Sequence, residues 1–143
     1  MSNSKAKTAK QNTSFDYKSI KSFEDACAKL ALNPSTLPEV SLLPEEMRKA
    51  IVNVYKLFII FKAINNGWIP NWNDFNQYKY FPWLRIQASA ALSSGFGFSF
   101  STYDCDIASS GVGSRLCTDS SEKALYIAET FQDEYKEFFL YLE

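Results

Sequence analysis

The chain has 143 residues, a length that suits one domain, and its 46% hydrophobic and 22% charged residues are typical of a soluble globular protein. Its net charge is −1 and it contains no histidine, which excludes Ser–His and Cys–His nucleophiles and removes the commonest metal ligand. We therefore expect no catalytic residues, no metal site and no cofactor, and a protein that is not an enzyme.

The three cysteines, Cys27, Cys105 and Cys117, are widely spaced and form no CxxC pair. This spacing predicts free, buried thiols rather than a zinc site or a disulfide framework. The longest apolar run, residues 57–61, is too short to cross a bilayer and is followed by Lys62. No apolar segment follows the N-terminal lysines, so we expect no secretory signal and a cytoplasmic location.

The N-terminal segment is basic and poor in apolar residues. Residues 1–21 carry a net charge of +4 and residues 22–143 a net charge of −5. We interpret residues 1–20 as a disordered basic leader and residues 21–143 as a single globular domain. A leader of this kind can also contact nucleic acid or an anionic surface.

Two helices are predicted in the N-terminal half. Ser22 is a suitable N-cap, acidic residues follow it, and the apolar spacing over residues 23–30 fits one helical face. A second helix begins at Pro44 and carries an apolar stripe from Met47 to Ile64. Its second half is apolar on nearly every side, so we expect it to be central. The Asn65-Asn66-Gly67 sequence predicts its end.

Three strands are predicted next. Residues 68–76 are rich in turn formers and predict a loop. Residues 77–88 read as a strand in which Pro82 requires an edge position or a bulge. Phe96, Phe98 and Phe100 alternate with small residues, which is typical of a half-buried strand. A third short strand is expected over about residues 112–118.

Asp119 or Ser120 is expected to cap a long C-terminal helix. Its inward stripe comprises Ala124, Ile127, Ala128, Phe131, Tyr135, Phe138 and Leu142. The predicted fold is α+β: two N-terminal helices, a small antiparallel three-stranded meander and a long C-terminal helix, with the helices packed on one face of the sheet.

Eleven of the 23 aromatic residues, including all three tryptophans, lie between Trp68 and Tyr103. Such density is typical either of an aromatic core or of a surface that holds a flat or apolar partner. In the second case, a concave aromatic patch rimmed by two arginines would hold a planar, nucleotide-like anion or a protein partner. The predicted ligand-binding residues are Trp68, Trp72, Tyr78, Tyr80, Trp83, Arg85, Ser114 and Arg115.

Residues 111–115, Gly-Val-Gly-Ser-Arg, lack the spacing of known phosphate loops. They predict a turn into the third strand, or alternatively an anion anchor formed by Arg115, Ser114 and backbone N–H groups. Asp104, Asp106 and Asp119 form no recognised metal motif. Few cations accompany the aromatic residues, which argues against nucleic-acid binding.

Two segments carry a family resemblance. Residues 67–74, Gly-Trp-Ile-Pro-Asn-Trp-Asn-Asp, followed by residues 77–83, resemble short uncharacterised proteins encoded by phages and prophages of gut Bacteroidetes. So do residues 112–117 with the helix after them, and the helix start at residues 22–27. Where that group has an aromatic residue after Arg-Leu-Cys, this chain has Thr118. The resemblance implies a phage-encoded accessory protein in the cytoplasm of a bacterial host.

These observations favour a non-enzymatic binding protein. It would act by occupancy on a host protein, or sequester a small nucleotide-like ligand, as a counter-defence protein can. The alternatives are a virion or assembly component, which would form a homo-oligomer, and a nucleic-acid accessory protein that uses the basic leader. No membrane partner is expected.

Overall fold

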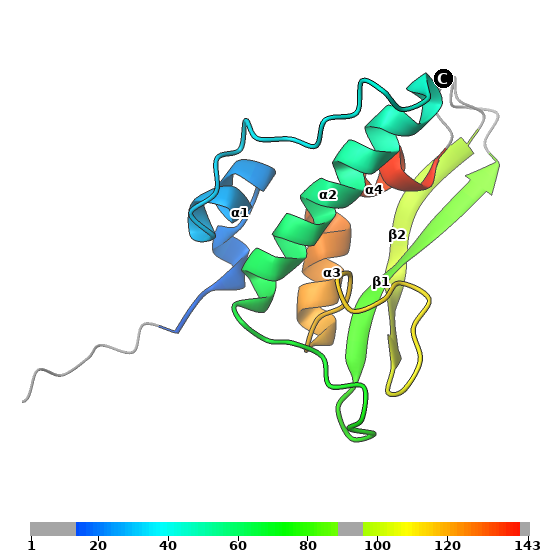
Figure 1. Cartoon of the computed structure of the whole chain (residues 1–143). Coiled ribbons are helices and arrows are strands. Elements are labelled where there is room, and N and C mark those ends of the chain that lie inside the picture. The colour runs from blue at the N-terminus through cyan, green and yellow to red at the C-terminus, as the bar shows by residue number, and fades with distance from the viewer. Residues whose placement is uncertain (1–13, 89–95, 141–143) are drawn as a thin grey trace, which may run out of the picture.

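The structure is a computed structural model that describes residues 14–88 and 96–140. Within these ranges the chain forms a short 3₁₀ helix, four α-helices and two β-strands (Figure 1). In chain order they are η1 (Tyr17–Ser19), α1 (Phe23–Lys29), α2 (Glu45–Asn65), β1 (Lys79–Ala88), β2 (Phe96–Asp106), α3 (Ser121–Thr130) and α4 (Gln132–Phe139).

Helix α1 begins where the sequence predicted. The Asp25 backbone N–H donates to Ser22 Oγ at 3.1 Å, which satisfies one of the unpaired N–H groups of the first turn. Phe23, Ala26 and Cys27 are buried. The N-cap and the inward face of this helix are thus confirmed.

Helix α2 is the longest element of the described chain, with 21 residues. Its second half is central, as predicted, because its buried residues begin only at Leu57. Met47 and Ile51, which belong to the predicted inward stripe, are instead exposed. The helix ends at Asn65, and Asn66 adopts the left-handed conformation, with φ 46° and ψ 46°.

Strands β1 and β2 form a two-stranded antiparallel sheet. The register shifts between Trp83 and Leu84, next to Pro82, which agrees with the bulge expected from a proline in a strand. The chain between the strands, residues 89–95, lies outside the described residues. The side chains of Phe96, Phe98 and Phe100 are not described either.

The predicted third strand over residues 112–118 is wrong. Only Thr118 pairs with the sheet, through two backbone hydrogen bonds to Tyr80 of 2.9 and 2.8 Å. The physical reason lies just before it: the N–H groups of Val112 and Gly113 donate to Ser110 Oγ, so they are used in a turn rather than in a ladder.

The predicted single C-terminal helix is also wrong, because α3 and α4 are separated at Phe131. This residue has φ −116° and ψ 37°, outside the helical range, and its side chain is buried. The break redirects the chain, so that α3 packs on the hairpin and α4 packs on α2. The Ser120 N-cap is confirmed, since the Lys123 N–H donates to its hydroxyl at 3.3 Å.

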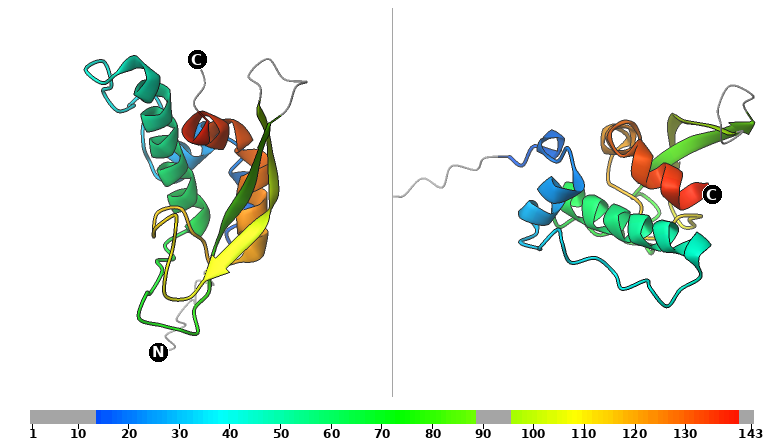
Figure 2. Two further views of the ribbon diagram at one scale, coloured as in Figure 1. Left: turned by 90° about the vertical axis from the view of Figure 1, so that its right-hand side faces the viewer. Right: turned by 90° about the horizontal axis from the view of Figure 1, so that it is seen from above.

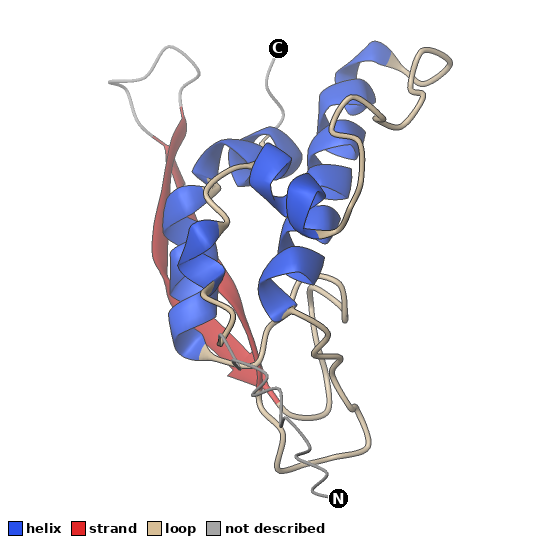
Figure 3. Ribbon diagram, turned by 90° about the vertical axis from the view of Figure 1, so that its left-hand side faces the viewer, coloured by secondary structure: helices blue, strands red, loops and turns tan. Residues whose placement is uncertain are grey.

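The predicted architecture as a whole therefore needs correction. The α+β character holds, but the described chain has four α-helices and a two-stranded sheet in place of the meander and long terminal helix. Helix α1 and the hairpin lie at opposite ends of the molecule, with the other helices between them (Figures 1 and 2). The core lies among the helices (Figure 3) and includes Ile60, Phe61, Ile64, Leu116, Ile127, Phe131 and Tyr135.

Residues 14–20 belong to the segment interpreted as a leader, and residues 1–13 lie outside the described residues. Ile20 is buried, and the Tyr126 hydroxyl donates to the carbonyl oxygens of Lys18 and Ile20 at 3.2 and 2.8 Å. The Tyr17 and Tyr126 rings meet edge to face at 5.4 Å. This stretch is thus packed against α3.

Candidate ligand pocket

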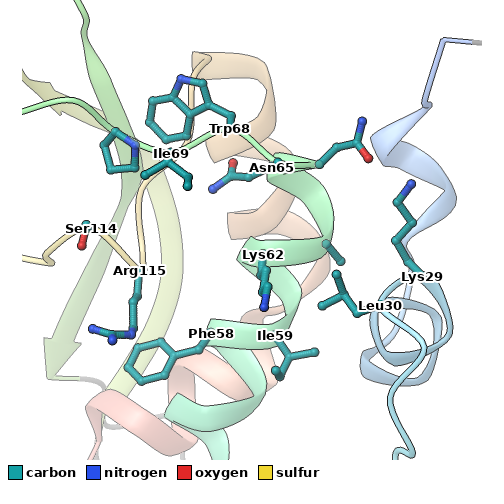
Figure 4. Close-up of a pocket in the computed structure, with 14 residues that line it drawn as sticks. Lys29, Leu30, Phe58, Ile59, Lys62, Asn65, Trp68, Ile69, Ser114 and Arg115 are labelled. Atoms are coloured by element: carbon teal, nitrogen blue, oxygen red, sulfur yellow. The ribbon is translucent and has the colours of Figure 1, made fainter.

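A pocket with a volume of about 740 Å³ lies at the C-terminal half of α2 (Figure 4). This volume is within the range of small-molecule sites in proteins. Four segments form its walls: the end of α1, the exposed face of α2, residues 67–70 and residues 114–115. The lining residues are Lys29, Leu30, Phe58, Ile59, Lys62, Ala63, Asn65, Asn66, Gly67, Trp68, Ile69, Pro70, Ser114 and Arg115.

The charged residues of the pocket are all cations. Lys29, Lys62 and Arg115 line it, and no aspartate or glutamate does. Within the described parts of the chain, none of the three forms an ion pair. A protein with a net charge of −1 thus concentrates positive charge at this place, which favours an anionic ligand.

Most of the remaining wall is apolar. Phe58 and Ile59 contribute from α2, and Trp68, Ile69 and Pro70 from the loop that follows it. Ile69 is 78% exposed, so its side chain is accessible to a ligand. These surfaces suit a flat or apolar group.

Arg115 connects the cationic part of the pocket wall with the aromatic part. Its guanidinium carbon lies 5.8 Å from the centre of the Phe58 ring, within cation–π range. Such a contact holds the plane of the guanidinium while its N–H groups remain free for a carboxylate or a phosphate.

Local backbone conformations create the two loops of the pocket. Asn66 and Gly67 both have positive φ, 46° and 91°, which turns the chain sharply from α2 toward Trp68. Gly113, with φ 73°, does the same before Ser114, in the turn closed by the Ser110 hydroxyl. The Gly-Val-Gly-Ser-Arg segment is thus a turn that also carries Ser114 and Arg115 to the pocket.

Asn65 lies at the base of the pocket and connects its two loops. The side-chain Nδ2 donates to the carbonyl oxygen of Cys117 at 2.9 Å, and the backbone carbonyl accepts from the Trp68 N–H at 2.9 Å. The side-chain Oδ1 is buried and has no hydrogen-bond partner within the described parts of the chain. It is an unused acceptor.

Three of the eight predicted ligand-binding residues, Trp68, Ser114 and Arg115, line this pocket. The other five lie elsewhere. The Trp72 ring faces the Lys79 ammonium at 5.3 Å. Tyr80 lies near both Tyr78 and another tyrosine, Tyr103, with ring centres 6.2 and 5.6 Å from its own.

Trp83 and Arg85 are exposed on β1 and do not line the pocket. The described part of the aromatic segment is therefore not one concave patch, and most of its described aromatic side chains are not buried. Phe81 is buried, whereas Phe75, Tyr78 and Trp83 are among the exposed large hydrophobic residues.

Sequence reasoning missed the pocket residues that come from helices, chiefly Lys29, Phe58, Lys62 and Asn65. Lys62 gave no signal beyond its place in the last turn of α2. Lys29 gave none beyond its place in the last turn of a helix, where cations are common. That Lys62 and Arg115 line the same pocket depends on tertiary structure alone.

The carboxylates considered as metal ligands are occupied by protein donors. Asp106 accepts from the Ser109 hydroxyl at 2.6 Å and from neighbouring backbone N–H groups, and these bonds lower its pKa to about 2. Asp119 pairs with Lys123 at 2.8 Å, and Asp104 accepts from the Cys105 N–H. No cluster of three or more potential metal ligands occurs in residues 14–88 and 96–140.

No helix in the described part of the chain is long and apolar enough to cross a membrane. Comparison with protein-family models, curated proteins and solved structures finds no match to this chain.

Proposed function

We propose that this protein is a non-enzymatic binding protein that sequesters a small, planar organic anion of nucleotide-like character. The observation that carries the proposal is the pocket beside α2, which combines three cations and no carboxylate with an apolar, partly aromatic wall. A phosphate or carboxylate would lie near Arg115 and Lys62, and a flat ring near Trp68, Ile69 and Pro70.

The charge pattern separates this ligand class from two others. A neutral apolar ligand would leave three cations partly desolvated without a counter-charge, which is unfavourable. Inorganic phosphate would leave the apolar wall in water. An anion with an attached ring satisfies both parts of the pocket.

The resemblance to phage-encoded proteins of gut Bacteroidetes gives this activity a biological setting, which is part of the proposal. Occupancy alone suffices for a protein that removes a nucleotide-like molecule from the host cytoplasm. That mode of action needs no catalytic residue, and sequestration of a host signal is one form of counter-defence.

The first experiment is native mass spectrometry of the purified protein, followed by calorimetric titration with AMP, GMP, CMP and UMP. A ligand of a few hundred daltons that is lost on denaturation, or saturable binding of one nucleotide, supports the proposal. A ligand-free protein that binds none of the four contradicts it and directs attention to a protein partner or an assembly.

A matched pair of variants tests the place of binding. Arg115→Ala removes a pocket cation and is expected to weaken binding by about tenfold to a hundredfold, since hydrogen bonds to charged groups contribute about 1.5–3 kcal/mol. Arg85→Ala removes the same charge from an exposed position on β1 outside the pocket and is expected to change affinity by less than about twofold. Equal losses in the two variants would place the site elsewhere.

A further inference from the structure

The Asn65 side chain has one hydrogen-bonding group in use and one that is unused. The residue is 9% exposed, and its Oδ1 is buried without a partner in the described structure. A buried acceptor left unpaired is unfavourable, and native proteins usually supply it with a donor. Asn65 lines the pocket, so a bound ligand is in a position to supply that donor.

The orientation of the amide is fixed by its other contact. Nδ2 lies 2.9 Å from the Cys117 carbonyl oxygen, an acceptor that can be paired only with a hydrogen-bond donor. Rotating the amide by 180° would bring two acceptor oxygens together. The free group of Asn65 is therefore an acceptor, and it can recognise only a hydrogen-bond donor.

We infer that Asn65 determines ligand specificity by accepting a hydrogen bond from an N–H group on the ring of the ligand. This inference rests on the proposed function and makes it more specific. The ligand is then an anion attached to a heteroaromatic ring with an amino or imino N–H, as every common nucleobase has, and not to a ring that lacks a donor.

The layout of the pocket agrees with this arrangement. Asn65 lies beside Trp68 and Ile69, the apolar part of the wall, whereas Arg115 and Phe58 lie toward its other end (Figure 4). Phe58 and Asn65 are seven residues apart on one helix, about 10 Å along its axis. A mononucleotide bridges such a span with its phosphate at one end and its base at the other.

Access to Oδ1 involves Trp68. The oxygen is shielded from solvent, and the indole lies next to the amide in the pocket wall (Figure 4). The inference requires the Trp68 ring, which is half-buried and does not belong to the hydrophobic core cluster, to move aside when the ligand binds. The ring of the ligand would then lie against the indole, with its N–H directed at Oδ1.

The test compares ligands that differ in a single donor. AMP and UMP are titrated calorimetrically beside purine riboside 5′-monophosphate, which lacks the amino group of AMP, and N3-methyluridine 5′-monophosphate, which lacks the imino N–H of UMP. For whichever parent nucleotide binds more tightly, the analogue without the donor is expected to bind about tenfold more weakly or worse. Equal affinities for parent and analogue overturn the inference while leaving the proposed function intact.

The variant Asn65→Leu completes the test from the protein side. Leucine has a similar volume and no acceptor, so the variant is expected to bind parent and analogue equally. Circular dichroism and thermal unfolding establish whether the variant is folded. If it is not folded, the comparison of parent and analogue with the wild-type protein still tests the inference. A folded variant that still discriminates overturns the inference, whereas failure of AMP, GMP, CMP and UMP alike to bind the wild type overturns the proposed function.

Discussion

At the scale of single residues, Lys79 shows how this fold holds a charged side chain in its interior. The side chain is 1% exposed, and its ammonium group donates to the carbonyl oxygens of Asp74 and Ile107 at 3.1 and 2.9 Å. It also faces the Trp72 ring at 5.3 Å. Lys79 thereby links the loop before β1 to the loop after β2.

We expect Lys79→Met to lower the free energy of unfolding by about 1–3 kcal/mol. Methionine keeps most of the apolar stem but leaves two carbonyl oxygens without their donor, and this loss outweighs the relief from burying a charge. Urea unfolding measures the change. The exposed Lys62→Met serves as control, with an expected change within about 0.5 kcal/mol. A Lys79→Met variant as stable as the wild type would show that the ammonium group makes no net contribution to the free energy of unfolding.

The three cysteines differ in reactivity for physical reasons visible at each site. Cys27 and Cys117 are buried and Cys105 is half-buried. Burial raises the pKa of the Cys117 thiol from 9.0 to about 11, although the nearby Lys79 ammonium opposes part of that rise, and burial also raises the pKa of Cys27. The thiolate is the reactive form, so both buried thiols are protected twice, by access and by protonation.

In the folded protein, we expect a disulfide reagent at about pH 8 to label Cys105 rapidly and the other two cysteines only at the rate of unfolding. Peptide mapping of the modified protein identifies the labelled residue. Rapid labelling of Cys117 would show that its surroundings open readily.

The raised pKa of Cys117 also means that the free energy of unfolding decreases as pH rises from 9.0 to about 11, because the unfolded chain loses its thiol proton first.

At the scale of elements, the helix boundaries that carry a local capping or stop signal were the features best predicted from sequence. Ser22 and Ser120 cap their helices with the predicted hydroxyl contacts, and α2 ends at the Asn-Asn-Gly sequence. The same signal shapes the pocket, since the turn at Asn66 and Gly67 leads directly to Trp68.

Gly67→Ala tests the contribution of that turn. The position has φ 91° and no atom within 4 Å of the added Cβ, so the cost is backbone strain alone, about 1–2 kcal/mol in the free energy of unfolding. Gly111→Ala is the matched control: its Cβ also meets open space, and its φ lies outside the positive range that disfavours alanine, so stability should stay the same or rise by up to about 1 kcal/mol. Denaturant unfolding distinguishes them, and equal stabilities would mean that residue 67 relaxes to another conformation.

Features that depend on competition between distant elements were not predictable. The helical period from Ala124 to Tyr135 is continuous in sequence, yet the chain bends at Phe131, because α3 and α4 pack on different partners. Likewise, residues 112–118 have strand-like composition, but the Ser110 hydroxyl uses the N–H groups that a ladder would need.

In the candidate site, too, residues with a local sequence signal were predicted, and residues brought in by tertiary packing were not. Trp68, Ser114 and Arg115 were predicted from an aromatic segment and a glycine-rich turn, which are local signals. Lys29 and Lys62 join them only because α1 packs on α2. Trp83 and Arg85 belong to a similar local pattern, but the hairpin places them outside the pocket.

At the scale of the whole molecule, the distribution of charge matters more than its total. The chain has 15 basic and 16 acidic residues, so no strong net field attracts an anion from a distance. The three pocket cations act over short range, and Lys29, Lys62 and Arg115 are all exposed enough for salt to screen them. Affinity should therefore depend on the charge of the ligand and on ionic strength.

We expect a neutral nucleoside to bind at least about tenfold more weakly than its 5′-monophosphate at low ionic strength, because it lacks the partner for Arg115 and Lys62. Raising the salt from about 0.05 M to about 0.5 M should shrink this difference, since the Debye length then falls well below the width of the pocket. Calorimetric titration of adenosine and AMP at both salt concentrations measures it. The apolar contribution from Trp68 and Ile69 is insensitive to salt, so adenosine itself should bind equally at both. A nucleoside that binds as tightly as its monophosphate would mean that the cations face solvent without a ligand, and that the apolar wall alone selects what this pocket holds.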